Sequence, residues 1–157
     1  SYCYYPPIGQ RSFGPMRAQV AYGSDYYQHA NKNIISLAMI ETKEAVDNLD
    51  AILSVPNLTG IYIGPADMSS SYGLPPKFDV KEDPVFSNIQ MIVKKAKDKG
   101  KVAGIHNGSV QYLKEMIKIG FQFTSLLSDF RIMSSHAENL LKEIKNVDTK
   151  SDKTSAY

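Results

Sequence analysis

The sequence predicts an α/β protein with a parallel sheet, and two observations carry this prediction. Four short apolar runs rich in β-branched residues alternate with stretches whose apolar residues recur at helical spacing. Each run ends in a glycine, proline or polar residue that indicates a turn. Such alternation is typical of βα units joined by right-handed crossovers. Periodicity alone leaves two architectures open, a small doubly wound sheet and part of a (β/α)8 barrel, which usually needs about 250 residues.

The chain before the first predicted strand reads as a loop followed by a weak helix. Residues 1–14 are rich in tyrosine, proline and glycine and have no sustained period, which predicts irregular structure. A helix is expected over residues 16–31, with an interruption around Gly23. Arg11 and Arg17 are cationic groups that could hold an anion, and solvated surface arginines are the alternative.

Regular alternation begins at residue 34. The predicted strands span residues 34–40, 60–63, 101–105 and 121–127, and the predicted helices span residues 42–54, 84–99, 110–119 and 130–145. Pro84 suits the start of a helix, Ser109 suits a cap, and Gly100 and Gly120 suit helix ends. Residues 69–83, with a glycine and two prolines, are expected to form a loop.

Composition excludes several classes of protein. The chain has 157 residues, of which 43% are hydrophobic and 22% charged, as expected of one soluble domain. We assign residues 1–146 to this domain and residues 147–157 to a disordered polar tail. A net charge of +2 gives no indication of nucleic acid or a membrane surface as partner, and no apolar run could span a membrane. Cys3 is the only cysteine, which excludes a disulfide framework and favours a reducing, cytoplasmic compartment.

Two acidic residues follow two successive predicted strands, at the positions where α/β proteins bind ligands. Glu41 closes the first strand, and Asp67 comes just after the Gly-Pro turn that ends the second. Paired carboxylates are the hard oxygen donors that a magnesium-type ion prefers. Helix capping is the alternative for either acid alone, because carboxylates are favoured near helix N-termini.

One histidine is a further site candidate. His106 is the only histidine at a predicted strand end, where it can assist substrate or water. Loop packing, or support of other site residues, is the alternative. His29 and His136 lie within predicted helices and read as surface residues. Asp129 follows the last strand, where it can cap the final helix or support the site.

Three blocks of sequence resemble the HpcH/HpaI aldolase family. They are Tyr-Pro-Pro-x-Gly-x-Arg-Ser-x-Gly-Pro at residues 5–15, Met-Ile-Glu-Thr-x-Glu-Ala at 39–45 and Ile-Gly-Pro-Ala-Asp-Met-Ser at 63–69. The resemblance extends to about residue 145. The family comprises metal-dependent (class II) pyruvate aldolases, such as 4-hydroxy-2-oxoheptanedioate aldolase, within the phosphoenolpyruvate/pyruvate barrel superfamily. The resemblance therefore implies the carboxyl-terminal part, about four βα units, of a (β/α)8 TIM barrel.

The resemblance also implies roles for single residues. The metal-binding glutamate and aspartate of the family fall on Glu41 and Asp67. Backbone amides of the Gly-Pro-Ala-Asp turn contact the pyruvate carboxylate in the family, and many members have a substrate-contacting glutamine where this chain has methionine. The catalytic histidine and arginine of the family lie in the amino-terminal half, and nothing here aligns with them. The substrate-binding residues implied in this way are Met39, Gly64, Pro65, Ala66 and Asp67.

The implied function is a carbon–carbon lyase. Such an enzyme makes or cleaves a bond between pyruvate, or a similar 2-oxo acid, and an aldehyde through a metal-stabilised enolate. The implied cofactor is a divalent ion, Mg²⁺, Mn²⁺ or Co²⁺. A homo-oligomer is expected because family members form dimers that swap their last helix and assemble into hexamers. A non-catalytic half-barrel that serves as an assembly or binding module stays open as the alternative. Without the aligned histidine and arginine, the 157 residues are expected not to catalyse alone.

Overall fold

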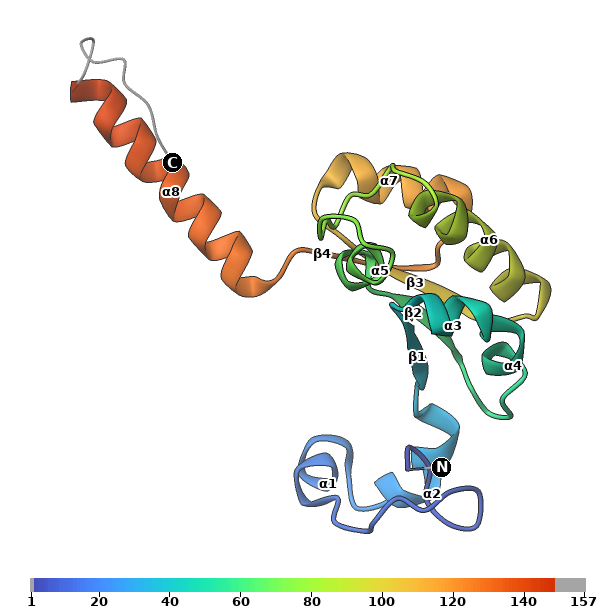
Figure 1. Ribbon diagram of the computed structural model, residues 1–157. Coiled ribbons are helices and arrows are strands. Elements are labelled where there is room, and N and C mark those ends of the chain that lie inside the picture. The colour runs from blue at the N-terminus through green and yellow to red at the C-terminus, as the bar shows by residue number, and fades with distance from the viewer. Residues whose placement is uncertain (1, 149–157) are drawn as a thin grey trace.

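A computed structural model describes residues 2–148 of the chain (Figure 1). Two short helices precede four strands, and at least one helix follows each strand. The elements are α1 (Met16–Tyr22), α2 (Tyr26–Asn33), β1 (Leu37–Ile40), α3 (Lys43–Asp47), α4 (Leu49–Leu53), β2 (Gly60–Ile63), α5 (Pro65–Ser71), α6 (Val85–Asp98), β3 (Val102–Asn107), α7 (Val110–Ile119), β4 (Phe123–Leu126) and α8 (Asp129–Asp148).

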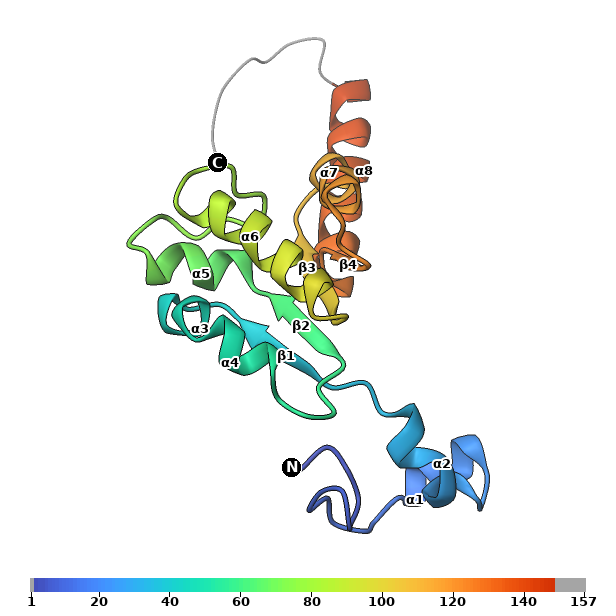
Figure 2. The same ribbon diagram turned by 90° about the vertical axis from the view of Figure 1, so that its right-hand side faces the viewer.

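The four strands form one parallel sheet in the order β1-β2-β3-β4, so every strand pairs with its neighbour in sequence (Figure 2). Ile40 pairs with Ile63, and Ile63 pairs with Ile105, which places the carboxyl ends of the strands at one edge. Strand order does not reverse anywhere in this sheet, whereas a doubly wound sheet has a reversal. The sequential order is the one expected for consecutive units of a barrel.

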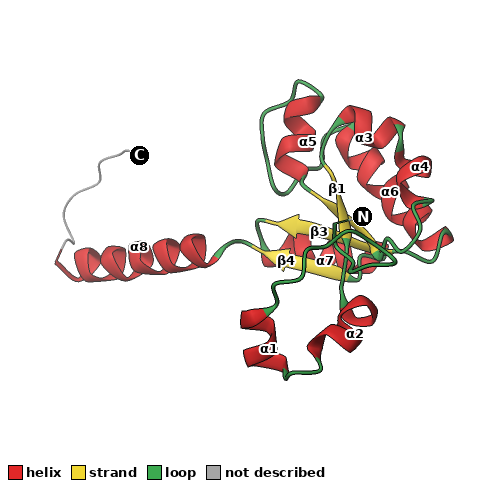
Figure 3. Cartoon of the chain, turned by 90° about the horizontal axis from the view of Figure 1, so that it is seen from below, coloured by secondary structure: helices red, strands yellow, loops and turns green. Residues whose placement is uncertain are grey.

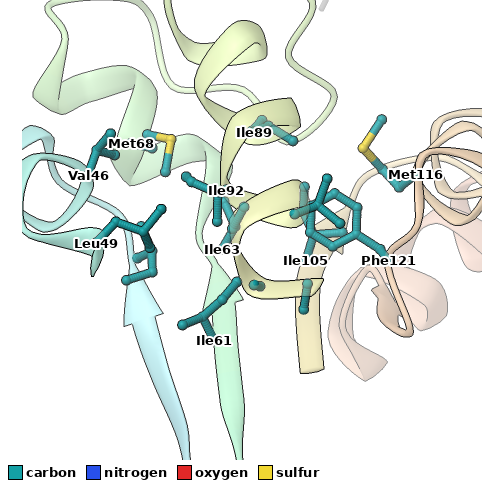
Figure 4. Packing of buried hydrophobic residues seen from close by; sticks show 14 of the residues in the cluster. Val46, Leu49, Ile61, Ile63, Met68, Ile89, Ile92, Ile105, Met116 and Phe121 are labelled. Carbon is teal, nitrogen blue, oxygen red and sulfur yellow. The ribbon is translucent and has the colours of Figure 1, made fainter. Parts of the chain in front are cut away.

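One face of the sheet packs against helices and forms the core. Alternate residues of β2 and β3 are buried, among them Ile61, Ile63 and Ile105. They meet apolar residues of α4 and α6, as Figure 4 shows for Leu49 and Ile92. Burial stabilises by about 25 cal/mol per Å² of apolar surface, so this buried layer stabilises the packing of the helices on the sheet.

The opposite face of the sheet is partly open. Its side chains come from the other alternate positions of the strands. Met39 on β1 is 52% exposed and Phe123 on β4 is 49% exposed, and Tyr62 on β2 is half-buried. In a closed barrel this face would line the interior. The open face is therefore where the rest of a barrel would pack.

Local signals explain where several elements begin and end. The Thr42 side chain accepts a hydrogen bond from the Ala45 N–H (3.0 Å) at the start of α3. Ser109 caps α7 in the same way through the Tyr112 N–H (3.2 Å). Gly120 ends α7 in a left-handed conformation with a φ of 115°. The predicted cap at Ser109 and the predicted end at Gly120 are confirmed.

Three predicted elements were wrong in detail. The helix expected over residues 42–54 is divided into α3 and α4 at Asn48, whose side chain donates to the Glu44 carbonyl (2.9 Å) and competes with the helical bonds. The loop expected from residue 69 begins later, because α5 occupies residues 65–71 and starts with a proline at its first position. The first strand begins at Leu37 instead of residue 34, because α2 extends to Asn33.

Helix α8 extends away from the sheet and the other helices in Figures 1 and 3, and in the view of Figure 2 it lies behind α7. It ends at Asp148, so the predicted tail over residues 147–157 lies almost wholly outside the described residues. None of the helices within residues 2–148 is long and apolar enough to cross a membrane. The exposed apolar residues of α8 are Phe130, Ile132, Met133, Leu140, Leu141 and Ile144.

The amino-terminal segment folds around a buried tyrosine. The Asn31 side chain binds both backbone groups of Tyr5, accepting from its N–H (2.7 Å) and donating to its carbonyl (3.0 Å). The Arg11 guanidinium lies 4.7 Å from the centre of the Tyr5 ring and donates to the Tyr26 hydroxyl (3.3 Å). Arg11 thus has a packing role in this segment, and Arg17 is exposed.

Candidate active site

A hollow of about 190 Å³ lies at the carboxyl edge of the sheet. The edge is formed where β1, β2 and β3 end, which is the position that α/β barrels use for ligands. The structure brings all of the metal-binding, substrate-binding and histidine candidates from the sequence together at this hollow. The residues lining it are Met39, Glu41, Tyr62, Gly64, Pro65, Ala66, Asp67, Phe78 and His106.

Glu41 enters the hollow directly from the end of β1. The Gly64 N–H donates to the Ile40 carbonyl (3.3 Å), which holds the ends of β1 and β2 together. A β-carbon built on Gly64 would lie 2.9 Å from Glu41 Oε2, so only glycine leaves the carboxylate its place. Thr42, the next residue, makes the capping bond of α3. The capping alternative for Glu41 is therefore wrong.

Asp67 and its neighbour reach the hollow from the first turn of α5. The first helical bond of α5 runs from the Met68 N–H to the Gly64 carbonyl (3.0 Å). The N–H groups of Ala66 and Asp67 precede that bond, and no group among residues 2–148 accepts from them. The Asp67 side chain is exposed and makes no capping bond. The turn therefore offers two backbone donors beside a carboxylate.

The two carboxylates have no cationic partner within the part of the chain that the structure describes. Within the same part, no group of three or more His, Cys, Asp or Glu side chains could hold a metal ion. The protein donor set at this hollow is thus limited to Glu41 and Asp67. Magnesium-type ions commonly take one or two carboxylates and complete their coordination with water and substrate oxygens. The two residues therefore fit such an ion.

His106 lies on the open face of β3 and is held on two sides. Its Nδ1 atom lies 2.9 Å from the Ser125 Oγ, and this hydroxyl also bonds the Tyr62 hydroxyl. The Phe78 ring packs edge-on against the imidazole, with ring centres 4.8 Å apart and an interplanar angle of 70°. Tyr62, Ser125 and Phe78 were not predicted from the sequence. Strand alternation was the available signal for the first two, because both lie on the same sheet face as His106.

The loop that carries Phe78 is tied to the end of β3 and to α7. Asp79 accepts a hydrogen bond from the Gly108 N–H (2.7 Å), and the buried Tyr112 hydroxyl donates to the Val80 carbonyl (2.7 Å). Burial, reinforced by the nearby Asp79 carboxylate, raises the pKa of Tyr112. These two contacts fix the loop and thereby the wall of the hollow that Phe78 forms.

Asp129, His29 and His136 do not line the hollow. Asp129 begins α8 and accepts a hydrogen bond from the Phe130 N–H (2.7 Å), in line with the capping alternative, and it does not line the hollow. His29 and His136 are exposed helix residues, as predicted. Met39 lines the hollow beside Glu41 and presents an apolar, half-exposed side chain to it.

The fold and the hollow define a class of protein, part of a (β/α)8 barrel with a carboxylate site at the carboxyl ends of its strands. The family model described as HpcH/HpaI aldolase/citrate lyase matches residues 1–134. The chain belongs to this family.

Similar proteins agree on the family and on the extent of the match. The chain is 37% identical over 142 residues to the hydroxypyruvate/pyruvate aldolase of Rhizorhabdus wittichii, a match that covers 90% of the chain and 57% of that protein. It is 32% identical over 156 residues to the 2-keto-3-deoxy-L-rhamnonate aldolase of Salmonella paratyphi A, covering 98% of the chain and 58% of that protein.

A solved structure shows the same fold over a similar share of its length. The HpcH/HpaI aldolase/citrate lyase family protein from Burkholderia cenocepacia J2315 superimposes with a TM-score of 0.79 at 22% identity, covering 91% of the chain and 57% of that protein. The chain thus spans little more than half the length of the proteins it matches. The fold is that of a partial TIM barrel.

Proposed function

We propose that this chain carries the metal-binding and 2-oxo-acid-binding part of a metal-dependent aldolase that acts on pyruvate or a similar 2-oxo acid. The observation that carries the proposal is the convergence of two unpaired carboxylates and two free backbone donors on one hollow. The aldolase names of the two relatives described above support the reaction class. No observation favours the non-catalytic alternative.

Glu41 and Asp67 would hold the divalent ion, Mg²⁺, Mn²⁺ or Co²⁺. Both are oxygen donors, both line the hollow, and neither is neutralised by a lysine or arginine within residues 2–148. When bound, such an ion acts as a Lewis acid on the carbonyl of a 2-oxo acid. The absent side chain of Gly64 keeps the position of the Glu41 carboxylate open.

The start of α5 would bind the carboxylate of the 2-oxo acid. The free N–H groups of Ala66 and Asp67 point out of the first helical turn, where the helix dipole also favours a negative charge. Pro65 has no N–H and sets the backbone of the turn at the first helical position. The carboxylate and the ion would thus be bound by adjacent parts of one short segment.

The aldehyde end of the substrate would contact the apolar wall of the hollow. Met39 and Phe78 supply this wall, and both are at least one-third exposed, so they have surface available for a ligand. His106 is the polar group on the same side, in contact with Phe78. A small aldehyde with an apolar carbon and one oxygen suits this combination.

The working enzyme would contain a second half of the barrel, either covalently attached or supplied by another chain. Strands β1 and β4 are open sheet edges within residues 2–148, and the face bearing Met39 and Phe123 is exposed. The exposed apolar face of α8 would serve a homo-oligomer. The chain together with this half is called the complete enzyme.

The test measures release of pyruvate from 4-hydroxy-2-oxopentanoate by the complete enzyme. We expect release that a chelator abolishes and Mn²⁺ restores. Glu41→Gln should abolish it together with the Mn²⁺-induced rise in melting temperature, which corresponds to about 2.7 kcal/mol at a hundred times the Kd. Glu44→Gln, an exposed glutamate of α3, is the matched control and should keep both. Chelator-insensitive release, or full activity in Glu41→Gln, would contradict the proposal.

A further inference from the structure

The two sides of the hollow differ in chemistry. Glu41 and Asp67 line the side next to β1 and β2, and His106 lines the side next to β3. Phe78, from the loop between α5 and α6, packs against His106 with ring centres 4.8 Å apart. Under the proposed function, a 2-oxo acid bound beside the two carboxylates extends its other end toward Phe78.

The position of the Phe78 ring is set by its neighbour Asp79. The Asp79 carboxylate accepts a hydrogen bond from the Gly108 N–H (2.7 Å), directly after the end of β3. A β-carbon built on Gly108 would lie 3.1 Å from Phe78 Cβ and 3.3 Å from Asp79 Oδ1. The absent side chain of Gly108 therefore lets the loop approach the strand closely, and Asp79 holds the ring at the edge of the hollow.

The same loop carries two lysines, and neither lines the hollow. Lys77 forms an ion pair with Glu82 in the same loop. Lys81 Nζ lies 2.9 Å from Glu115 Oε2 on α7. Both ammonium groups are thus engaged by carboxylates outside the hollow, and the loop presents an aromatic ring to the hollow in place of a cation.

The charges at the hollow disfavour a second anionic group on the substrate. Glu41 and Asp67 are acidic, and no lysine or arginine within residues 2–148 lines the hollow. A bound divalent ion offsets the two acids, and the carboxylate of the 2-oxo acid then leaves a negative balance. A further carboxylate at the aldehyde end would lose water and find no cationic partner among these residues, which costs free energy.

We propose that Phe78 is a specificity-determining residue that selects short neutral aldehydes over aldehydes bearing a carboxylate, and that Asp79 is the residue that positions it. The inference rests on the proposed aldolase function and names the class of its second substrate. The carbon chain of a neutral aldehyde packs on the ring, which is 36% exposed and lies beside the apolar Met39 side of the same hollow. A carboxylate in this place meets only apolar surface.

The first test measures binding of two 2-oxo acids that cannot be cleaved because they lack a hydroxyl at C4. Isothermal titration of the complete enzyme with Mn²⁺ compares 2-oxopentanoate with 2-oxoheptanedioate, which ends in a second carboxylate. We expect the wild type to bind 2-oxopentanoate about tenfold more tightly, the usual effect of one unpaired charge. Phe78→Arg should reverse this preference, because a guanidinium pairs with the added carboxylate.

Two controls accompany the titration. Ile117→Ala, at an exposed apolar position of α7 that does not line the hollow, should keep the wild-type preference. Every variant should keep the Mn²⁺-induced rise in melting temperature, which reports an intact fold and metal site. Equal affinities in the wild type, or a preference that Phe78→Arg leaves unchanged, would overturn the inference.

The second test measures pyruvate release from 4-hydroxy-2-oxopentanoate and from 4-hydroxy-2-oxoheptanedioate. Phe78→Ala should lower kcat/KM for the first by about tenfold, the lower end of the range for a lost apolar contact, and should change the second less. Asp79→Ala should narrow the difference in the same direction. Asp79→Asn, which keeps an oxygen acceptor for the Gly108 N–H, should restore it.

The outcomes separate this inference from the proposed function. A wild-type preference for 4-hydroxy-2-oxoheptanedioate, or an unchanged ratio of the two kcat/KM values in Phe78→Ala, overturns the role of Phe78 alone. An Asp79→Asn enzyme that behaves like Asp79→Ala overturns the positioning role. A wild type that releases pyruvate from neither substrate overturns the proposed function.

Discussion

Glu41 and Asp67 reach the same hollow from different positions in their βα units. Glu41 follows β1 directly, and Asp67 belongs to the first turn of the helix after β2. Position at strand ends was sufficient to select both acids and His106 from the sequence. Ser125 and Phe78 were missed for a physical reason, since their places depend on strand register and on a loop whose anchors are distant in sequence.

Met39 provides a prediction at the residue scale. Met39→Gln should tighten the binding of pyruvate to the complete enzyme severalfold. The methionine is 52% exposed in the hollow, so the replacement loses little apolar burial and adds a donor and an acceptor beside the 2-oxo acid.

Isothermal titration with pyruvate and Mn²⁺ measures the effect, with Met39→Leu as the control that keeps an apolar wall. A clear loss of affinity in Met39→Gln would contradict a polar substrate contact here. It would instead indicate that the methionine fills an apolar wall of the pocket.

At the scale of elements, single polar contacts join α6 to α4 and join α7 to the loop before α6. Lys95 on α6 lies 2.7 Å from the Asp50 carboxylate on α4, and Tyr112 on α7 holds the loop before α6. The helices themselves were predictable from apolar spacing, capping residues and glycine stops. The division at Asn48 and the helix α5 were not, because one depends on a side-chain bond to the backbone and the other is short and lacks an apolar period.

The ion pair between Asp50 and Lys95 predicts a pH dependence of stability. The hydrogen bond from Lys95 lowers the pKa of Asp50 in the folded chain. A lowered pKa gives a contribution that is present above the unfolded value, near 4, and is lost as the pH falls through the folded value.

Asp50→Asn should therefore flatten the dependence of the urea midpoint on pH below about 5, near the unfolded value. Asp98→Asn, at an exposed position near the end of α6, is the control. An Asp50→Asn profile that matches the wild type from acid to neutral pH would show that the pair contributes nothing measurable, a common result for exposed pairs.

Tyr112 predicts a larger loss of stability. Tyr112→Phe leaves the Val80 carbonyl without its donor in a buried position, which costs about 1–3 kcal/mol. Because burial raises the pKa of Tyr112, its contribution is complete below the usual value near 10 and is lost as the pH rises beyond it.

Urea unfolding at neutral pH measures the loss, and Tyr22→Phe, an exposed tyrosine of α1, is the control. Equal unfolding free energies for Tyr112→Phe and the wild type would mean that the bond does not hold the Phe78 loop in place.

At the scale of the whole molecule, the chain presents surfaces that a complete barrel would cover. Within residues 2–148, one sheet face is open, β1 and β4 have free edges, and α8 carries an exposed apolar face. Alternating strands and helices predicted a parallel sheet, but only the family resemblance indicated part of a barrel. The direction of α8 was not predictable, because nothing in its own sequence specifies the surface against which it packs.

Under the proposed function, these residues would form half of a metal-dependent pyruvate aldolase. The most direct test of this proposal is the rate of pyruvate release from 4-hydroxy-2-oxopentanoate with Mn²⁺ present, measured for the isolated 157-residue chain and for the complete enzyme. We expect chelator-sensitive release by the complete enzyme and none above background by the isolated chain. Chelator-sensitive release by the isolated chain at an enzymatic rate would contradict the need for a second half, and its absence from both would contradict the aldolase assignment.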